Sequence, residues 1–162
     1  TVANPVRRKD RLTDQLTDAT SKEYRKRNRS VRISRGTIDP AVWLREQYTN
    51  NAEQMVCQIC KEEMPFRKRD GDYYFEAVEA FSKEHLIKEH DAQYLALCPT
   101  CAAMYKEFIK SDEDTMVELK NMFLNTDSND FEVSIHLGKL KTSIRFVEVH
   151  LHDIKSILDG FE

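Results

Sequence analysis

Between residues 37 and 126, hydrophobic residues recur at helical spacing in three stretches, and each stretch predicts a helix. The first covers residues 39–51, where an aspartate cap is followed by proline at the first helical position. We expect it to dock on the core through an apolar face of Trp43, Leu44 and Tyr48. The second begins within residues 98–101 and continues to residue 109. The third covers residues 111–123, where a serine or an aspartate caps a stripe of large apolar residues.

Turn chemistry predicts a hairpin between the first two of these helices. Asp70-Gly71 is a strong turn signal, and it separates residues 64–66 from an aromatic-rich stretch at residues 73–81. Aromatic residues are enriched in strands, so we interpret residues 73–81 as the second strand of the hairpin.

The C-terminal part of the chain predicts a second hairpin followed by a helix. Residues 131–137 alternate strictly between apolar and polar, as a half-buried strand does. Residues 138–141 turn the chain, and residues 143–149 return as the second strand. A closing helix then presents one apolar face, made of Leu151, Ile154, Ile157 and Leu158. Because so small a ββα unit is marginal by itself, we expect it to pack on the preceding domain.

The four cysteines of the chain form two Cys-x-x-Cys pairs, Cys57/Cys60 and Cys98/Cys101. A two-residue gap lets both sulfurs of a turn point at one centre, and two such pairs complete the tetrahedral shell of a structural zinc ion. The interpretation is therefore a Zn²⁺ cofactor with these four residues as its ligands. Disulfides or redox-active pairs and a different metal are the alternatives, and the absence of a visible secretory signal disfavours disulfides.

A cysteine pair on a turn, then strands, then a pair that opens a helix is the arrangement of a treble-clef zinc finger. The stretch from residue 57 to 106 also resembles the HNH nuclease family, in its subgroup with four zinc-binding cysteines. The resemblance rests on Cys57-Gln58-Ile59-Cys60, on Tyr74-Phe75-Glu76-Ala77 and on Leu95-Ala96-Leu97-Cys98-Pro99-Thr100-Cys101-Ala102. It implies an HNH-like ββα domain built around the metal.

The chain departs from the HNH pattern at the positions where that family carries its chemistry. Val78 and Glu79 stand where the family has its two strand histidines, and Ala102 stands where it has a histidine after the last cysteine. Valine neither takes a proton nor binds a metal, so we assign no catalytic residue. The alternative is a rebuilt metal site that uses Glu76, Glu79 and His85, because carboxylates bind hard cations such as Mg²⁺.

A wider stretch, about residues 20–160, resembles the C-terminal end of large bacterial proteins that carry a sacsin-like ATP-binding domain upstream. The motifs that carry this resemblance are Arg29-Ser30-Val31-Arg32, Tyr48-Thr49-Asn50, Tyr74–Glu79 and the helix start at Leu97–Tyr105. It implies a terminal module whose partners include upstream domains of a parent chain, and it suggests defence against foreign DNA. The lack of an initiating methionine also favours a fragment of a longer protein.

Four histidines could be considered as further metal ligands, but each has a simpler interpretation. His85 and His90 lie in a polar segment, so we expect exposed loop residues. His150 and His152 begin the last helix, where a capping or surface role is expected rather than a second metal site.

Charge is divided unevenly along the chain. Residues 1–35 hold eleven Lys and Arg against four Asp and Glu, and since the whole chain has a net charge of −3, the remainder carries −10. A basic arm on an acidic body can bind nucleic acid through phosphate contacts; a solvated basic linker is the alternative. Beside the predicted hairpin turn, Arg67, Lys68 and Arg69 are candidate phosphate contacts, with a solvated turn as their alternative.

Composition fits a globular protein with polar segments, since 33% of the 162 residues are charged and 40% are hydrophobic. No run approaches the roughly 20 apolar residues that cross a bilayer, so we expect no membrane partner and a cytoplasmic location. No small-molecule site is evident in the sequence.

These patterns together predict an α+β protein in three parts. A basic linker or partner-dependent helix covers residues 1–36, an HNH-like zinc domain with flanking helices covers 37–126, and the ββα unit covers 127–162. The leading hypothesis is a non-catalytic binding module of a larger bacterial protein, which engages nucleic acid or another domain. A divergent metal-dependent endonuclease and a structural or oligomerising cap are the alternatives.

Overall fold

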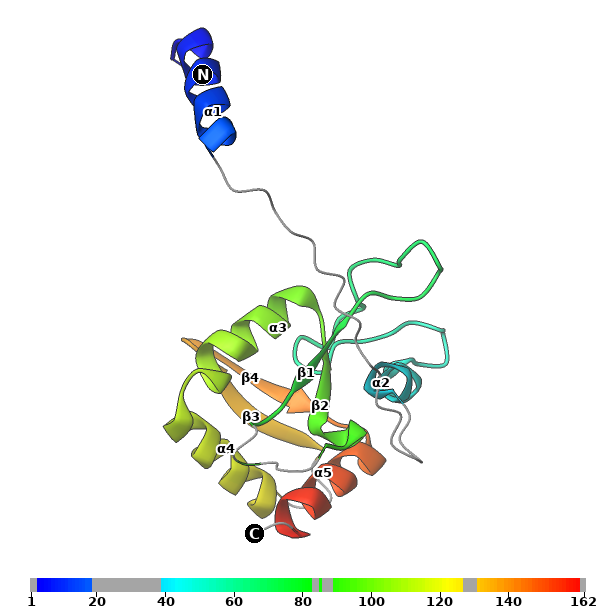
Figure 1. The fold of residues 1–162 in the computed structure, drawn as a ribbon. Coiled ribbons are helices and arrows are strands. Elements are labelled where there is room, and N and C mark those ends of the chain that lie inside the picture. The colour runs from blue at the N-terminus through cyan, green and yellow to red at the C-terminus, as the bar shows by residue number, and fades with distance from the viewer. Residues whose placement is uncertain (1–2, 19–38, 83–84, 86–88, 127–130, 161–162) are drawn as a thin grey trace. The chain divides into compact units, whose positions relative to one another are not determined.

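The computed structural model describes residues 3–18, 39–82, 85, 89–126 and 131–160 (Figure 1). The chain divides into two compact units, Thr1–Ile33 and Ser34–Glu162. The first unit contains helix α1 (Pro5–Asp18), and all of its side chains that the structure describes are exposed. Residues 19–36 of the predicted basic arm lie outside the described residues. In the part of the chain that is described, no helix is long and apolar enough to cross a membrane.

The second unit combines helices with two antiparallel sheets of two strands each, which confirms the predicted α+β class. Figure 1 shows helices α3, α4 and α5 arranged around these strands. In chain order the elements are α2 (Pro40–Tyr48), β1 (Glu76–Glu79), the 3-10 helix η1 (Asp91–Gln93), β2 (Tyr94–Leu97), α3 (Pro99–Tyr105), the π-helix η2 (Lys106–Lys110), α4 (Glu113–Asn125), β3 (Glu132–Leu137), β4 (Leu140–Arg145) and α5 (Glu148–Gly160).

The predicted caps are in place. The Asp39 side chain accepts a hydrogen bond from the Ala41 N–H at 2.8 Å, and Asp112 accepts one from the Asp114 N–H at 3.3 Å. Each bond satisfies a backbone donor that has no partner within its own helix. Leu44 on α2 is fully buried, which agrees with the expected docking face of that helix.

The first predicted hairpin is only partly right. Its turn exists: Gly71 takes φ +94°, and the Lys68 N–H donates to the Asp72 carbonyl at 2.7 Å. The regular strand, however, is limited to β1, and its partner is β2 rather than residues 64–66. The sequence pattern does not indicate a strand at β2 because Leu95, Ala96 and Leu97 are all fully buried, so the stretch lacks the alternation that marks a half-buried strand.

The second predicted hairpin is confirmed as β3 and β4, with corrected bounds for its turn and its second strand. Leu137 pairs with Leu140 across a two-residue turn in which Gly138 takes φ +64°. The second strand covers Leu140–Arg145 instead of residues 143–149, so the turn is shorter than the predicted 138–141, and α5 begins at Glu148. The prediction was too long because Val149 fits the apolar alternation of a strand. In the structure Val149 belongs to α5 and is 54% exposed.

One hydrophobic core joins β3, β4 and α5, the predicted ββα unit, to the rest of Ser34–Glu162. Phe123 of α4 packs edge-to-face against Phe81 and Phe146, with ring centroids 5.4 Å apart in both pairs. Phe81 follows β1 and Phe146 follows β4, so the three rings connect segments far apart in the sequence. Edge-to-face aromatic pairs add about 0.5–1.5 kcal/mol each beyond the burial of their area.

Candidate metal centre

The four cysteines meet at one point of the fold. Cys57 and Cys60 lie on a turn before β1, while Cys98 and Cys101 lie where β2 ends and α3 begins. Their sulfur atoms all lie within 4.8 Å of one another, and the Sγ atoms of Cys60 and Cys98 are 4.0 Å apart. Four sulfurs at about 2.3 Å from a zinc-sized ion would be about 3.8 Å apart, whereas a disulfide needs about 2.05 Å. All four residues are free thiols, so the cluster fits a metal ion.

Backbone hydrogen bonds shape both cysteine pairs. The Cys57 N–H donates to the Glu62 carbonyl at 3.0 Å, which closes the first turn. The Cys98 N–H donates to Cys57 Sγ at 3.4 Å, and the Cys101 N–H donates to Cys98 Sγ at 3.5 Å. Hydrogen bonds of this kind favour the thiolate over the thiol, because the charged sulfur is the better acceptor.

Burial and mutual contacts shift the pKa values of three of the four thiols, those of Cys57, Cys60 and Cys101. A hydrogen bond from Cys101 lowers the pKa of Cys57 to about 5. The same hydrogen bond and burial raise the pKa of Cys101, and burial raises the pKa of Cys60 to about 11. One thiolate forms readily and further ones are opposed by burial and by its charge. A divalent cation supplies the positive charge that four thiolates need.

The cluster is built into the core rather than into an open cleft. Cys57 is 1% exposed and Cys101 is 7% exposed, while Cys60 is the exposed member at the surface. Four protein sulfurs would fill the tetrahedral shell of a zinc-sized ion and leave no position for a water molecule or a substrate. The cluster is therefore compatible with a bound metal ion.

The structure does not bring the alternative ligands Glu76, Glu79 and His85 together. Glu76 Oε1 lies 3.4 Å from Lys106 Nζ, and Glu79 Oε1 accepts a hydrogen bond from the Tyr94 hydroxyl at 3.2 Å. His85 Nε2 lies 2.7 Å from Glu113 Oε1. Among the described residues, the four cysteines are the one group of three or more potential ligands.

His85 also differs from its prediction as an exposed loop residue. Only 12% of its side chain is exposed, because it lies against the Phe81 ring and pairs with Glu113. Its role in the described structure is a contact with the first turn of α4. A polar sequence context gives no sign of this contact, since Glu113 lies 28 residues further along the chain.

The candidate phosphate contacts Arg67, Lys68 and Arg69 are all exposed, but two of them have partners within the protein. The Arg67 guanidinium lies 4.1 Å from the centroid of the Tyr73 ring and donates to the Gly71 carbonyl at 3.0 Å. Lys68 Nζ lies 3.3 Å from Asp70. Arg67 therefore stabilises the turn, and Arg69 is exposed.

His150 is a residue whose importance the sequence interpretation missed. The predicted capping or surface role is wrong, because His150 is fully buried. Its Nε2 donates to the Ala92 carbonyl at 2.9 Å, so its Nδ1 accepts from the Tyr48 hydroxyl at 2.5 Å. A signal was present: residues 150, 154 and 158 share one helical face, and Ile154 and Leu158 are apolar.

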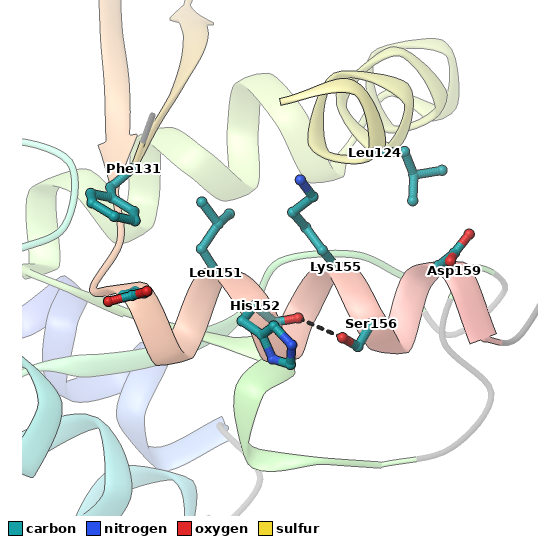
Figure 2. Close-up of a pocket in the computed structure, with 8 residues that line it drawn as sticks. Leu124, Phe131, Leu151, His152, Lys155, Ser156 and Asp159 are labelled. Carbon is teal, nitrogen blue, oxygen red and sulfur yellow. Dashed lines mark hydrogen bonds between the residues drawn. The ribbon is translucent and has the colours of Figure 1, made fainter. Parts of the chain in front are cut away.

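A separate hollow of about 410 Å³ lies between the end of α4 and α5. Figure 2 shows Leu151 and Lys155 of α5 pointing toward α4, and Leu124 opposite them. The Ser156 hydroxyl donates to the His152 carbonyl at 2.8 Å, and Lys155 Nζ donates to the Thr126 carbonyl. These polar groups are engaged within the protein, and the hollow contains none of the four cysteines.

No protein-family model matches this chain, and no curated protein matches it either. The cysteine cluster is therefore the feature from which its function must be inferred. Its four-thiol donor set and its burial are the properties on which the inference rests.

Proposed function

We propose that this chain is a non-catalytic binding module, held together by a structural zinc ion at Cys57, Cys60, Cys98 and Cys101, that engages nucleic acid. The observation that carries the proposal is the gathering of four free cysteine sulfurs within 4.8 Å of one another. Zinc is the ion proposed because four thiolates in a tetrahedral shell are a common structural zinc site.

The order of elements supports an HNH-like treble clef. A cysteine-bearing turn is followed by the antiparallel pair β1–β2, and the second cysteine pair opens α3 directly after β2. The same stretch carries the motifs that resemble the nuclease family. The resemblance to the C-terminal ends of sacsin-like bacterial proteins leads us to propose also that the chain is a terminal module of a larger protein.

The surroundings of the positions at which the HNH pattern has its histidines support a module without nuclease activity. Val78 is 3% exposed and Ala102 is fully buried, so both serve as core residues. The carboxylate of Glu76 faces the ammonium group of Lys106 at 3.4 Å, and a second cation there would be repelled by that lysine. A catalytic Mg²⁺ site would need ligands that the described residues do not gather.

Charge distribution supports nucleic acid as the partner and the arm as its main contact. The arm carries a net charge of +7 while the remainder of the chain carries −10, and Arg7, Arg8 and Arg11 are exposed on α1. On the body, Arg69 is the exposed basic residue of the hairpin turn that is best suited to this role, since Arg67 and Lys68 have internal partners. Phosphate contacts of this kind need charge and no catalytic geometry.

A combined binding and cleavage assay tests the proposal. Zinc-loaded protein is incubated with labelled single- and double-stranded DNA and RNA, with Mg²⁺ or Mn²⁺ and with EDTA, over a salt series. We expect binding that weakens with salt and no cleavage. Replacing Arg7, Arg8 and Arg11 by Gln should reduce the salt slope by about 0.7–0.9 for each phosphate that the arm no longer neutralises.

A control variant removes two positive charges from the body by replacing Lys139 and Lys141 with Gln, because both lysines are exposed on the C-terminal hairpin, away from the arm in sequence. This variant should bind as the unaltered protein does. Metal-dependent cleavage that Glu79→Gln abolishes would overturn the non-catalytic assignment. Failure to bind any nucleic acid would overturn the choice of partner and point to a protein partner.

A further inference from the structure

Gln58 lies between the first two cysteines and is 1% exposed. Its N–H donates to the Ala96 carbonyl at 3.0 Å, and its carbonyl accepts from the Arg145 N–H at 2.8 Å. The side-chain amide repeats both links: Oε1 accepts from the Ala96 N–H at 2.8 Å, and Nε2 donates to the Arg145 carbonyl at 2.9 Å. One residue thus occupies the place of a strand between β2 and β4.

These four bonds close two strand edges that would otherwise carry unpaired backbone groups. Ala96 belongs to β2, and its N–H and carbonyl both bond to Gln58 rather than to β1. Arg145 ends β4 and uses both of its backbone groups in the same way, on the edge opposite β3. The two sheets are therefore joined through the cysteine turn. The bonds matter to stability because a buried backbone group without a partner is costly.

Lys61 provides a second link from the same turn to β4. Its N–H donates to the Cys57 carbonyl at 3.0 Å, and its backbone takes φ +61°, which is unfavourable by about 1–2 kcal/mol for a residue with a Cβ. Its Nζ donates to the Ser143 carbonyl at 3.0 Å and to the Ser143 hydroxyl at 2.7 Å. Both anchors of β4 on this side thus come from within or directly after the Cys57–Cys60 pair.

We infer that metal occupancy at the cysteine centre and the docking of the β3–β4 hairpin are coupled through Gln58 and Lys61. This inference rests on the proposed metal site. An ion that holds Cys57 and Cys60 to the other pair fixes the turn between them, and the fixed turn presents both anchors to β4. Linkage is reciprocal, so a docked hairpin in turn strengthens metal binding.

The coupling differs from the general stabilisation that any structural metal gives. The aromatic packing of Phe146 on Phe123 does not involve the cysteine turn, and it retains the C-terminal unit in the core when the anchors are removed. Removal of the anchors therefore loosens the edge of β4 without unfolding the domain. A metal-dependent edge of β4 makes this hairpin a surface that changes with metal supply.

The test uses the full chain loaded with Co²⁺ or Zn²⁺ and the variant Gln58→Ala. Two quantities are measured: hydrogen exchange of the segment covering residues 140–147, and metal affinity by competition with a chromophoric chelator. We expect exchange of this segment to accelerate by about tenfold or more in the metal-loaded variant, because the Gln58 side-chain amide no longer donates to the Arg145 carbonyl and the edge of β4 opens more often. Metal affinity should fall in parallel with it.

Lys61→Met is the second variant, because it removes the Nζ bonds and leaves the buried amide of Gln58 intact, so it stays informative if Gln58→Ala does not fold. Gln54→Ala is the matched control: Gln54 is an exposed glutamine on the same segment and should change neither quantity.

The outcomes separate the two proposals. If the unaltered chain binds metal but both variants keep its exchange rates and affinity, the coupling is wrong and the metal site stands. If the unaltered chain binds neither ion, the metal site is wrong and the coupling falls with it.

Discussion

Acidification should destabilise this protein through His150, which is fully buried among aromatic rings. Its ring lies 5.0 Å from those of Trp43 and Phe146, and both nitrogens are committed, one as donor to Ala92 and one as acceptor from Tyr48. Burial lowers the pKa of His150 from its ordinary 6.5 to about 4. The neutral ring is the form that the folded state accommodates.

The direction and the magnitude of the pH effect on stability follow from the difference between these two pKa values of His150. Because the pKa is lowered on folding, the unfolded chain binds the extra proton first, so the stabilisation is complete above pH 6.5 and is lost as the pH falls toward 4. A difference of about 2.5 pKa units corresponds to about 3 kcal/mol in total, of which about 2 kcal/mol is lost by pH 5. That is a substantial fraction of the roughly 5–15 kcal/mol that stabilises a typical domain.

Urea unfolding at pH 7, 6 and 5 measures the effect, with His150→Gln as the reference. Gln retains a donor toward the Ala92 carbonyl and does not titrate, so this variant should be less stable at pH 7 but lose less stability on acidification. Thiolate protonation and metal release affect both proteins equally and cancel in the comparison. If both lose stability in parallel between pH 7 and pH 5, the reasoning about His150 is refuted.

Two further predictions concern the core and the turns. Phe123→Ala should destabilise the domain by about 3–5 kcal/mol in urea unfolding, because Phe123 is fully buried between two aromatic rings; Met122→Ala, at a position 40% exposed, should change little. Gly138→Ala should lower stability by about 1–2 kcal/mol, because φ is +64° there and the added Cβ would lie 3.2 Å from the Phe108 ring. Gly71→Ala, with φ +94° and open space around it, should lose a similar amount from backbone strain alone; a thermal unfolding midpoint unchanged in both variants would contradict the assignment of strain.

The sequence predicts correctly those features that a few neighbouring residues determine. Asp39 before proline marks the start of α2, and the strict alternation of residues 131–137 marks β3. The two Cys-x-x-Cys pairs point to one centre, and the four sulfurs do lie together. Each of these signals is contained within a few neighbouring residues.

Features that depend on distant contacts are the ones that sequence reasoning missed. β2 carries no alternating pattern because it is buried on both faces. Gln58 has the sequence context of an ordinary polar residue, and its role depends on Ala96 and Arg145, which lie far away in the sequence. The role of His150 escaped prediction because a histidine near a helix start is most often a surface residue, and its partner Tyr48 lies 102 positions earlier. Sequence periodicity ranks apolar positions well, but it does not identify polar residues that are satisfied inside a core.

The structural metal ion is the central claim, and metal analysis with chelation tests it most directly. The purified chain is analysed for metal content, and its thermal unfolding is followed before and after treatment with a strong chelator, with the Cys57→Ser variant alongside. We expect one zinc ion per chain, a marked loss of stability on chelation, and loss of the ion in the variant. A chain that contains no zinc, takes up none when it is supplied, and unfolds at the same temperature with and without chelator would contradict the claim.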